Sequence, residues 1–248
     1  MKKSKQPSKP ITKRTSKLKA KLLSSYYGNP AKDLFLICIT GTTGKATVAH
    51  FVHEILRAAD QRVAILASDS EIKTSLLHKF LSDAWKSGAT HVVVTAPPES
   101  LKANVFYGLP IQIAAITDFI PASLDAPTVT DYLTASSTLF TMNPETIILN
   151  RDDAHYDDFA KFSGTKQTLT YGVTSGSDIH ILSSELYKKG SEARLSFNKK
   201  PLTVASFLPG ETTISYMAAA TAIATALNIN PDIITEGIAN YEPKESQN

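Results

Sequence analysis

Residues 40–47 read Thr-Gly-Thr-Thr-Gly-Lys-Ala-Thr and directly follow an apolar run, residues 34–39. A glycine-rich turn between a strand and a helix lets the backbone approach an anion, so that successive N–H groups converge on it. The start of the helix adds a partial positive charge, and Lys45 adds a full one. The pattern predicts a phosphate-binding loop formed by Gly41, Thr42, Thr43, Gly44, Lys45, Ala46 and Thr47.

This loop departs in two ways from the usual nucleotide-binding pattern, Gly-x-x-x-x-Gly-Lys-Ser/Thr. Gly41 and Gly44 are only three residues apart, and Ala46 stands where a hydroxyl would ligate magnesium. An ordinary glycine-bearing turn would fit the bare string equally well. The phosphate-binding interpretation is favoured because apolar residues then recur with helical spacing, at Val48, Phe51, Val52, Ile55, Leu56 and Ala59.

The elements that must position this loop alternate along the chain. Short apolar strands are predicted at residues 62–66, 91–96, 111–117, 146–150 and 167–171, with helices at 75–88, 130–140 and 156–162 between them. Period-two patterning over residues 178–207 predicts a small antiparallel meander, and two helices follow, at 214–227 and up to about 240. The fold class is therefore α/β: a mostly parallel sheet with helices on both faces, plus the meander.

Composition limits the class of protein. The chain has 248 residues, 42% of them hydrophobic, which fits one large domain or a domain and a half. No apolar stretch reaches membrane-spanning length, and the N-terminus has no signal-peptide pattern. Cys38 is the single cysteine, so disulfides play no part, and we expect a cytoplasmic setting.

Positive charge is concentrated at the N-terminus. Residues 1–23 contain nine Lys or Arg and no acid, so the net charge of +3 becomes −6 for the remaining chain. We favour a flexible, solubilising arm with a short docking helix over a segment that binds nucleic acid or an anionic membrane. The predicted division is a basic tail at 1–30, a globular domain at 31–241 and a disordered end at 242–248.

Six motifs in order resemble the central ATP-binding domain of the Mur ligases, especially the UDP-N-acetylmuramoyl-tripeptide synthetases. The loop, Ile39 to Thr47, is similar to the family's ITGTNGKTT. The others are Ile116-Thr-Asp-Phe119, Leu124-Asp125 with Asp131-Tyr132 and Leu139-Phe140, Asn150-Arg-Asp-Asp153, Thr170-Tyr-Gly172, and Leu208-Pro-Gly210 before an alanine-rich helix. The resemblance implies a P-loop NTPase-like fold and ATP-dependent amide formation, through an acyl phosphate, in peptidoglycan precursor synthesis.

The resemblance also marks positions where the family's magnesium ligands and modified lysine are missing. The matching residues here are Ala46, Thr95, Ser123 and Ser136. Magnesium requires hard oxygen ligands, so we expect its binding to be impaired and assign no metal ligand. Thr47 is one stand-in, although one helical position turns a side chain by about 100°; Asp118, Asp125 and Glu99 are others, against a role as solvated loop acids.

Recognition of the nucleotide base is altered as well. The family's paired asparagines correspond to Thr213 and Tyr216, whereas Asn150 and Asp153 are retained. The retained pair is predicted to contact the adenosine side of the nucleotide. Their alternative role is local, with Asn150 ending a strand and the acids starting a helix.

Three hypotheses about function follow. The first is a ligase subunit completed by a partner chain, because the family's N- and C-terminal domains have no counterpart here. The second is a degenerate, catalytically impaired domain, a pseudoenzyme that binds a nucleotide or only a protein and acts as a regulator or scaffold. The third is an anchoring module that depends on the basic tail. We favour the second, and assign no catalytic residue.

Overall fold

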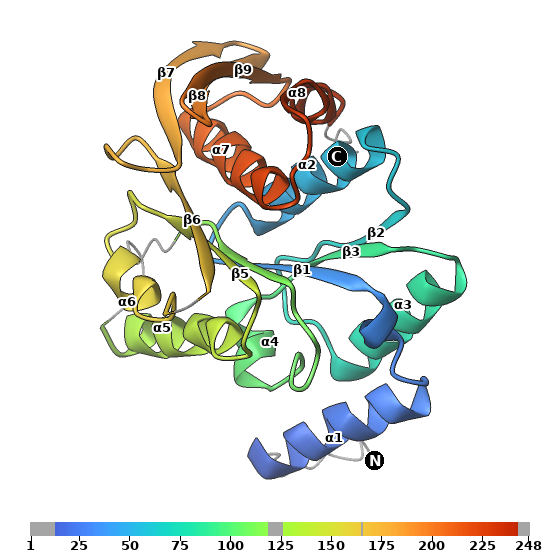
Figure 1. The fold of residues 1–248 in the computed structure, drawn as a ribbon. Helices are drawn as coiled ribbons and strands as arrows, with labels where there is room; N and C mark the ends of the chain where they lie inside the picture. Colours follow the sequence, from blue (N-terminus) through green and yellow to red (C-terminus); the bar gives the residue numbers. More distant parts are fainter. Residues whose placement is uncertain (1–12, 119–125, 165, 243–248) are drawn as a thin grey trace, which may run out of the picture.

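The computed structural model describes residues 13–118, 126–164 and 166–242 (Figure 1). In chain order the elements are α1 (Lys13–Tyr26), the 3-10 helix η1 (Pro30–Asp33), β1 (Phe35–Thr40), α2 (Lys45–Ala58), β2 (Val63–Leu66), α3 (Thr74–Lys86), β3 (His91–Thr95), α4 (Pro98–Lys102), β4 (Ile113–Ile116), α5 (Ala126–Phe140), β5 (Thr146–Asn150), α6 (Tyr156–Ala160), β6 (Gln167–Gly172), β7 (Ile179–Tyr187), β8 (Gly190–Phe197), β9 (Lys200–Ser206), α7 (Glu211–Ala226) and α8 (Pro231–Ala239).

All nine strands form one sheet, in the order β2-β3-β1-β4-β5-β6-β7-β8-β9. Strand β1 lies between β3 and β4 and is parallel to both, with Cys38 opposite Val94 on one side and Ala114 on the other. The pairs β7–β8 and β8–β9 are antiparallel. The predicted parallel sheet with a terminal meander is thus confirmed, and β1 carries the loop from the interior of the parallel part.

The two faces of β1 contribute to two separate cores. Ile37 and Ile39 pack in the cluster that contains α2, α7 and α8, whereas Leu36 and Cys38 pack in the cluster that contains α3, α4, α5 and α6. Successive side chains of a strand point to opposite faces, so one continuous apolar strand supplies both layers. Burial raises the pKa of the Cys38 thiol to about 12.

Helix α7 lies between the meander and α2 (Figure 1). Its residues Thr213–Ala224 are buried at almost every position, and most of them are Ala, Ile or Met. A helix that is apolar on all sides needs cover on all sides, which the curled end of the sheet provides. Helix α8 then packs against α2 and β9, closing the layer around the helix that begins at Lys45.

The starts of two helices differ from the sequence expectations by three residues or more. Helix α5 begins at Ala126 rather than near residue 130, and α7 begins at Glu211 rather than 214. For α7 the physical reason is Gly210, whose φ of 115° marks the turn before the helix. The predicted domain limits at residues 30 and 242 stay predictions. Ser123 and Asp125 lie outside the described residues, as do residues 1–12 of the basic tail and residues 243–248.

Within the described ranges, no helix combines the length and apolar character needed to cross a bilayer. Helix α1 packs on α3, at the outer side of the layer formed by α3 to α6 (Figure 1).

The contact between α8 and α2 depends on Gly237, and this generates a first prediction. A Cβ at Gly237 would overlap the backbone of Ile55 in α2, and backbone atoms cannot move aside cheaply. We expect Gly237→Ala to lower the free energy of unfolding by about 2 kcal/mol, measured by urea denaturation.

The matched control is Glu236→Ala, at an exposed position of the same helix. Its free energy of unfolding should stay within about 0.5 kcal/mol of wild type. Equal stability of the two variants would contradict the close packing of α8 on α2.

Candidate functional site

The predicted loop lies at the carboxyl end of β1, with the ends of β3 and β4 on either side. In sheets of this kind the carboxyl ends of parallel strands form the ligand-binding edge. Helix α2 begins at Lys45, and no side chain caps its N-terminus at Gly44. The N–H groups of its first turn have no intrahelical acceptor, so they are available to an anion.

Two glycines of the loop are required by its surroundings. Gly41 has a φ of 136° and Gly44 a φ of 74°. A Cβ at Gly41 would overlap the hydroxyl of Thr117, and a Cβ at Gly44 would overlap the ring of Tyr216. The loop is therefore held between β4 and α7 without room for a larger residue, and its backbone conformation is fixed before any ligand arrives.

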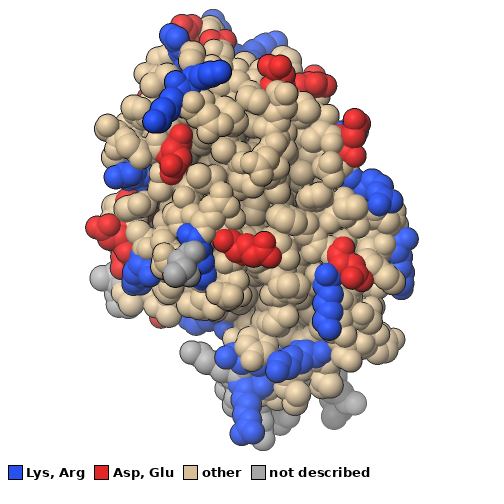
Figure 2. All heavy atoms as spheres, in the orientation of Figure 1, with Lys and Arg blue, Asp and Glu red and all other residues tan. Residues whose placement is uncertain are grey.

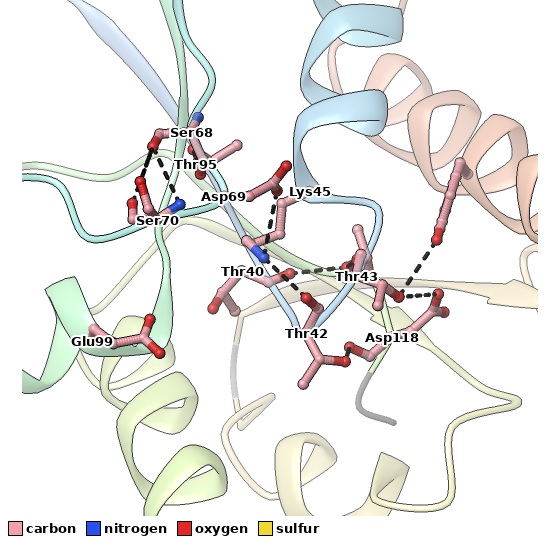
Figure 3. A network of polar contacts seen from close by, with 12 residues as sticks. Thr40, Thr42, Thr43, Lys45, Ser68, Asp69, Ser70, Thr95, Glu99 and Asp118 are labelled. Carbon is pink, nitrogen blue, oxygen red and sulfur yellow. Dashed lines mark hydrogen bonds and ion pairs between the residues drawn. The ribbon is translucent and has the colours of Figure 1, made fainter. Parts of the chain in front are cut away.

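The ammonium of Lys45 lies inside the loop (Figure 3). The Lys45 side chain is only 3% exposed; its Nζ donates to the Thr42 carbonyl at 3.2 Å and lies 3.7 Å from Asp69 Oδ1. Burial lowers the pKa of Lys45, while the carboxylates of Asp69 and Glu99 act in the opposite direction. A buried cation thus depends for neutralisation on Asp69, a carboxylate that is itself 72% exposed.

A second group of contacts ties the loop to the end of β4. The backbone N–H of Thr42 donates to the Asp118 carbonyl at 2.8 Å, and the Thr43 hydroxyl donates to Asp118 Oδ2 at 3.3 Å. Asn150, at the end of β5, donates to Asp118 Oδ1 at 3.1 Å. Burial raises the pKa of Asp118 and nearby Asp153 adds to this, whereas the hydrogen bonds from Thr43 and Asn150 oppose it.

Tyrosines complete this wall of the site. The Tyr216 hydroxyl lies 3.4 Å from Thr43 Oγ1, at the position where the resemblance expects an asparagine. Tyr171, at the end of β6, is fully buried and donates to the carbonyls of Ile116 and Thr117 at 2.9 and 3.0 Å. Tyr216 thus contacts the loop directly, whereas Tyr171 holds the end of β4 against which the loop lies.

The positions expected to hold magnesium do not fit that ion. Ala46 has no donor atom, and Thr95 is fully buried with its hydroxyl already engaged. Thr95 Oγ1 accepts from the Ser68 N–H and donates to the Ser68 carbonyl, both at 2.8 Å (Figure 3). The Ser136 hydroxyl is buried, with no hydrogen-bond partner among the described residues. Among the residues that the structure describes, no three His, Cys, Asp or Glu side chains cluster in a way that could hold a metal ion.

The suggested replacement ligands are dispersed. Glu99 lies on α4, away from the loop in Figure 3, and accepts a hydrogen bond from Tyr132 at 2.5 Å. Asp118 is engaged by Thr43 and Asn150, on the other wall. Thr47 follows Ala46 in the first turn of α2.

The retained Asn150 and Asp153 have local partners. Asn150 is buried and also donates to the Thr117 carbonyl at 3.2 Å, while Asp153 accepts from the His155 N–H at 2.8 Å. Neighbouring Asp152 accepts from the N–H groups of Val173 and Thr174. Asn150 is linked to the loop by its hydrogen bond to Asp118. The predicted contact of Asn150 and Asp153 with adenosine stays a prediction.

Sequence reasoning missed Asp69, Thr117 and Tyr171. A signal existed for the first two, because Asp69 follows the predicted strand 62–66 and Thr117 ends the predicted strand 111–117, where ligand-binding side chains gather. The hydroxyl of Thr117 donates to the Thr40 carbonyl at 3.3 Å and holds the start of the loop. Tyr171 stands in the motif Thr170-Tyr-Gly172, but that motif assigned it no role, since a buried Tyr usually only fills a core.

Comparison with known proteins agrees with this geometry. The model of the Mur ligase middle domain matches residues 39–224, from the end of β1 to α7. The chain belongs to the Mur ligase family. In this Mur ligase domain, the match begins just before the predicted phosphate-binding loop and ends in α7, whose Tyr216 packs on that loop.

Individual relatives agree with the assignment. UDP-N-acetylmuramoyl-L-alanyl-D-glutamate--2,6-diaminopimelate ligase of Bacillus licheniformis is 29% identical over 250 residues, covering 92% of this chain and 51% of that protein. A solved structure of a ligase of the same name has a TM-score of 0.81 at 23% identity, with coverage of 93% and 50%. The MurF ligase of Thermotoga maritima, solved in complex with ADP, has a TM-score of 0.71 at 16% identity, with coverage of 97% and 56%.

This Mur ligase domain therefore spans about half the length of the relatives that it matches. The likeness to the solved structures extends over nearly all of the chain, which confirms the predicted fold, including the meander and the helices after it.

The buried ammonium of Lys45 should lower the stability of the unliganded protein, although the same charge would favour the binding of an anion. Replacing Lys45 by Met removes a desolvated charge while keeping an unbranched apolar side chain. We expect Lys45→Met to raise the free energy of unfolding by about 1–2 kcal/mol in the unliganded protein. Urea denaturation without nucleotide measures this.

The pH dependence follows from the lowered pKa of Lys45. Between that pKa and the ordinary value of 10.5, the unfolded chain binds more protons than the folded one, so wild-type stability should rise with pH there. The advantage of Lys45→Met should be largest below the folded-state pKa and shrink towards pH 10.5. A destabilised variant at neutral pH would show that the pair with Asp69 outweighs the burial of the charge.

Proposed function

We propose that this Mur ligase middle domain binds the phosphates of a nucleotide, ATP in the first place, at residues 41–47. The observation that carries the proposal is the buried ammonium of Lys45, at the uncapped N-terminus of α2. A cation withdrawn from water needs an anion, and the uncapped N–H groups at the start of α2 favour a phosphate in place of the exposed carboxylate of Asp69. The MurF ligase of Thermotoga maritima, whose fold this chain shares, was solved in complex with ADP, which supports the choice of nucleotide.

We further propose that the domain has little or no catalytic activity by itself. Phosphoryl transfer depends mainly on positioning and on neutralising the charge of the transferred group. Lys45 can supply one positive charge to a bound phosphate. The hydroxyl of Thr95 is used to hold Ser68, and Ala46 offers nothing to a metal, so a second source of charge is lacking among these positions.

The wider role is inferred from the names of the relatives. Ligases that act on UDP-N-acetylmuramoyl peptides indicate descent from peptidoglycan precursor synthesis, in a cytoplasmic setting. A role as a regulatory or scaffold domain fits a site that binds nucleotide and does not turn it over. A ligase subunit completed by a partner chain would instead hydrolyse or transfer phosphate once that partner is present.

The direct test is calorimetric titration of the full chain with ATP and ADP, with magnesium and with a chelator. We expect binding without magnesium, with an affinity reduced about tenfold or more in Lys45→Ala because a charge-assisted contact is lost. Lys86→Ala, which removes an exposed lysine at the end of α3, is the control and should bind like wild type.

Absence of binding under all conditions would refute the nucleotide site. Strict magnesium dependence, or ATP hydrolysis by the chain alone, would refute the proposed impairment. Hydrolysis only after addition of a partner chain would favour the subunit hypothesis.

Asp69 generates a separate prediction, because its carboxylate occupies the position of a counter-ion that a phosphate would replace. Removing this competing anion should strengthen binding. We expect Asp69→Asn to lower the Kd for ATP in chelator by about two- to fivefold, since an exposed ion pair contributes roughly 0.2–1 kcal/mol.

The control is Asp83→Asn, which makes the same change in net charge on α3, at a side chain 54% exposed and paired with Lys79. Its Kd should equal that of wild type. Weaker ATP binding by Asp69→Asn would mean that Asp69 assists the ligand rather than competing with it.

A further inference from the structure

Helix α1 presents an apolar stripe to solvent. Leu18, Leu22 and Tyr26 are 55%, 61% and 80% exposed, and they follow one another at four-residue spacing. Residues four apart lie on the same side of a helix, so these three side chains form one outward stripe. This outward stripe has no described element of the protein against it.

The opposite side of α1 holds the helix on the protein. Ala20 is fully buried, and the Ser16 hydroxyl accepts from Asn104 Nδ2 at 3.0 Å. The ammonium groups of Lys17 and Lys21 lie 4.8 and 5.7 Å from the centre of the Tyr107 ring. These contacts fix which side of α1 faces the protein. The outward stripe is therefore exposed while the helix is packed in place.

Positive charge flanks the stripe at Arg14 and Lys19, and Lys17 and Lys21 add to the charge of the helix from the side of Tyr107. Arg14, Lys17, Lys19 and Lys21 lie in the same helix, which has no acidic residue. They belong to the nine basic residues of positions 1–23, in which no acid occurs. Figure 2 shows Lys and Arg without Asp or Glu at the lower end of the molecule, where Figure 1 places α1.

We propose that the outward stripe of α1 and its basic residues bind the surface of an anionic lipid bilayer. The apolar side chains would enter the boundary between headgroups and acyl chains, while the lysines extend to the anionic headgroups. One short apolar stripe binds a membrane weakly by itself, and a basic segment is the usual second contribution.

Charge and apolar character together favour lipid over two other occupants. Nucleic acid would contact the lysines, but its phosphates offer no apolar surface to two outward leucines that no described element covers. A second copy of the chain would bring another acid-free basic helix against this one, and like charges would repel. An anionic bilayer satisfies both features at once. The surface is separate from the nucleotide loop, so the inference does not rest on the proposed function.

The test is co-sedimentation of the full chain with vesicles of mixed phosphatidylglycerol and phosphatidylcholine, compared with phosphatidylcholine alone. We expect binding to the mixed vesicles only, weakened by added salt. The variant Leu18→Ser/Leu22→Ser should reduce the partition coefficient about tenfold, because two inserted side chains are lost. Arg14→Gln/Lys19→Gln should reduce it for anionic vesicles as well.

The matched control is Leu182→Ser/Leu186→Ser, which changes two leucines of β7 that are each 49% exposed. It should bind vesicles like wild type. Circular dichroism of each variant would verify that α1 remains folded. Equal binding to neutral and anionic vesicles, or unchanged binding of the Leu18→Ser/Leu22→Ser variant, would overturn the proposal. Binding to duplex DNA that survives the leucine changes, without binding to vesicles, would assign the basic residues to nucleic acid instead.

Discussion

The arrangement of the site depends on one electrostatic requirement: the ammonium of Lys45 is removed from water and must be neutralised where it lies. The protein provides one carbonyl and one exposed carboxylate, which is incomplete compensation for a buried charge. The surrounding structure keeps the charge there nonetheless. Thr117 and Tyr216 confine the loop on two sides, and α8 holds α2 through a contact that only glycine permits. The fold therefore maintains an unfavourable local state, for which the proposed phosphate would compensate.

Much of this arrangement could be predicted from local sequence. The alternation of apolar strands and helices indicated the parallel sheet, because strands buried on both faces need helical crossovers. The position of Gly41, Gly44 and Lys45 after a strand predicted where the loop would lie. The order of six motifs identified the family although each motif is weak. Helix boundaries were less accurate, since the start of α7 is set by the backbone of Gly210 rather than by the apolar pattern.

The contacts that decide how the site works could not be predicted in this way. The pairing of Lys45 with Asp69, and the packing of Tyr216 on Gly44, join residues that are distant along the chain. The contacts of Thr95 also could not be predicted from the sequence. Sequence comparison marked it only as a missing carboxylate, whereas in the fold its hydroxyl holds Ser68, next to the residue that pairs with Lys45. In the sequence, Thr95 shows only that the expected carboxylate is absent. The hydrogen bonds between its hydroxyl and Ser68 become apparent only in the fold.

The single thiol of the chain has a consequence for measuring how the site opens. Cys38 is 1% exposed in β1, and a pKa of about 12 leaves almost none of it as the reactive thiolate at neutral pH. A thiol reagent can therefore modify the protein only when the core around the Cys38 side chain opens. Because β1 leads into the loop proposed to bind phosphate, the labelling rate reports the opening of the core beside the strand that precedes Lys45. The protein thus contains its own probe for local unfolding, without an introduced label.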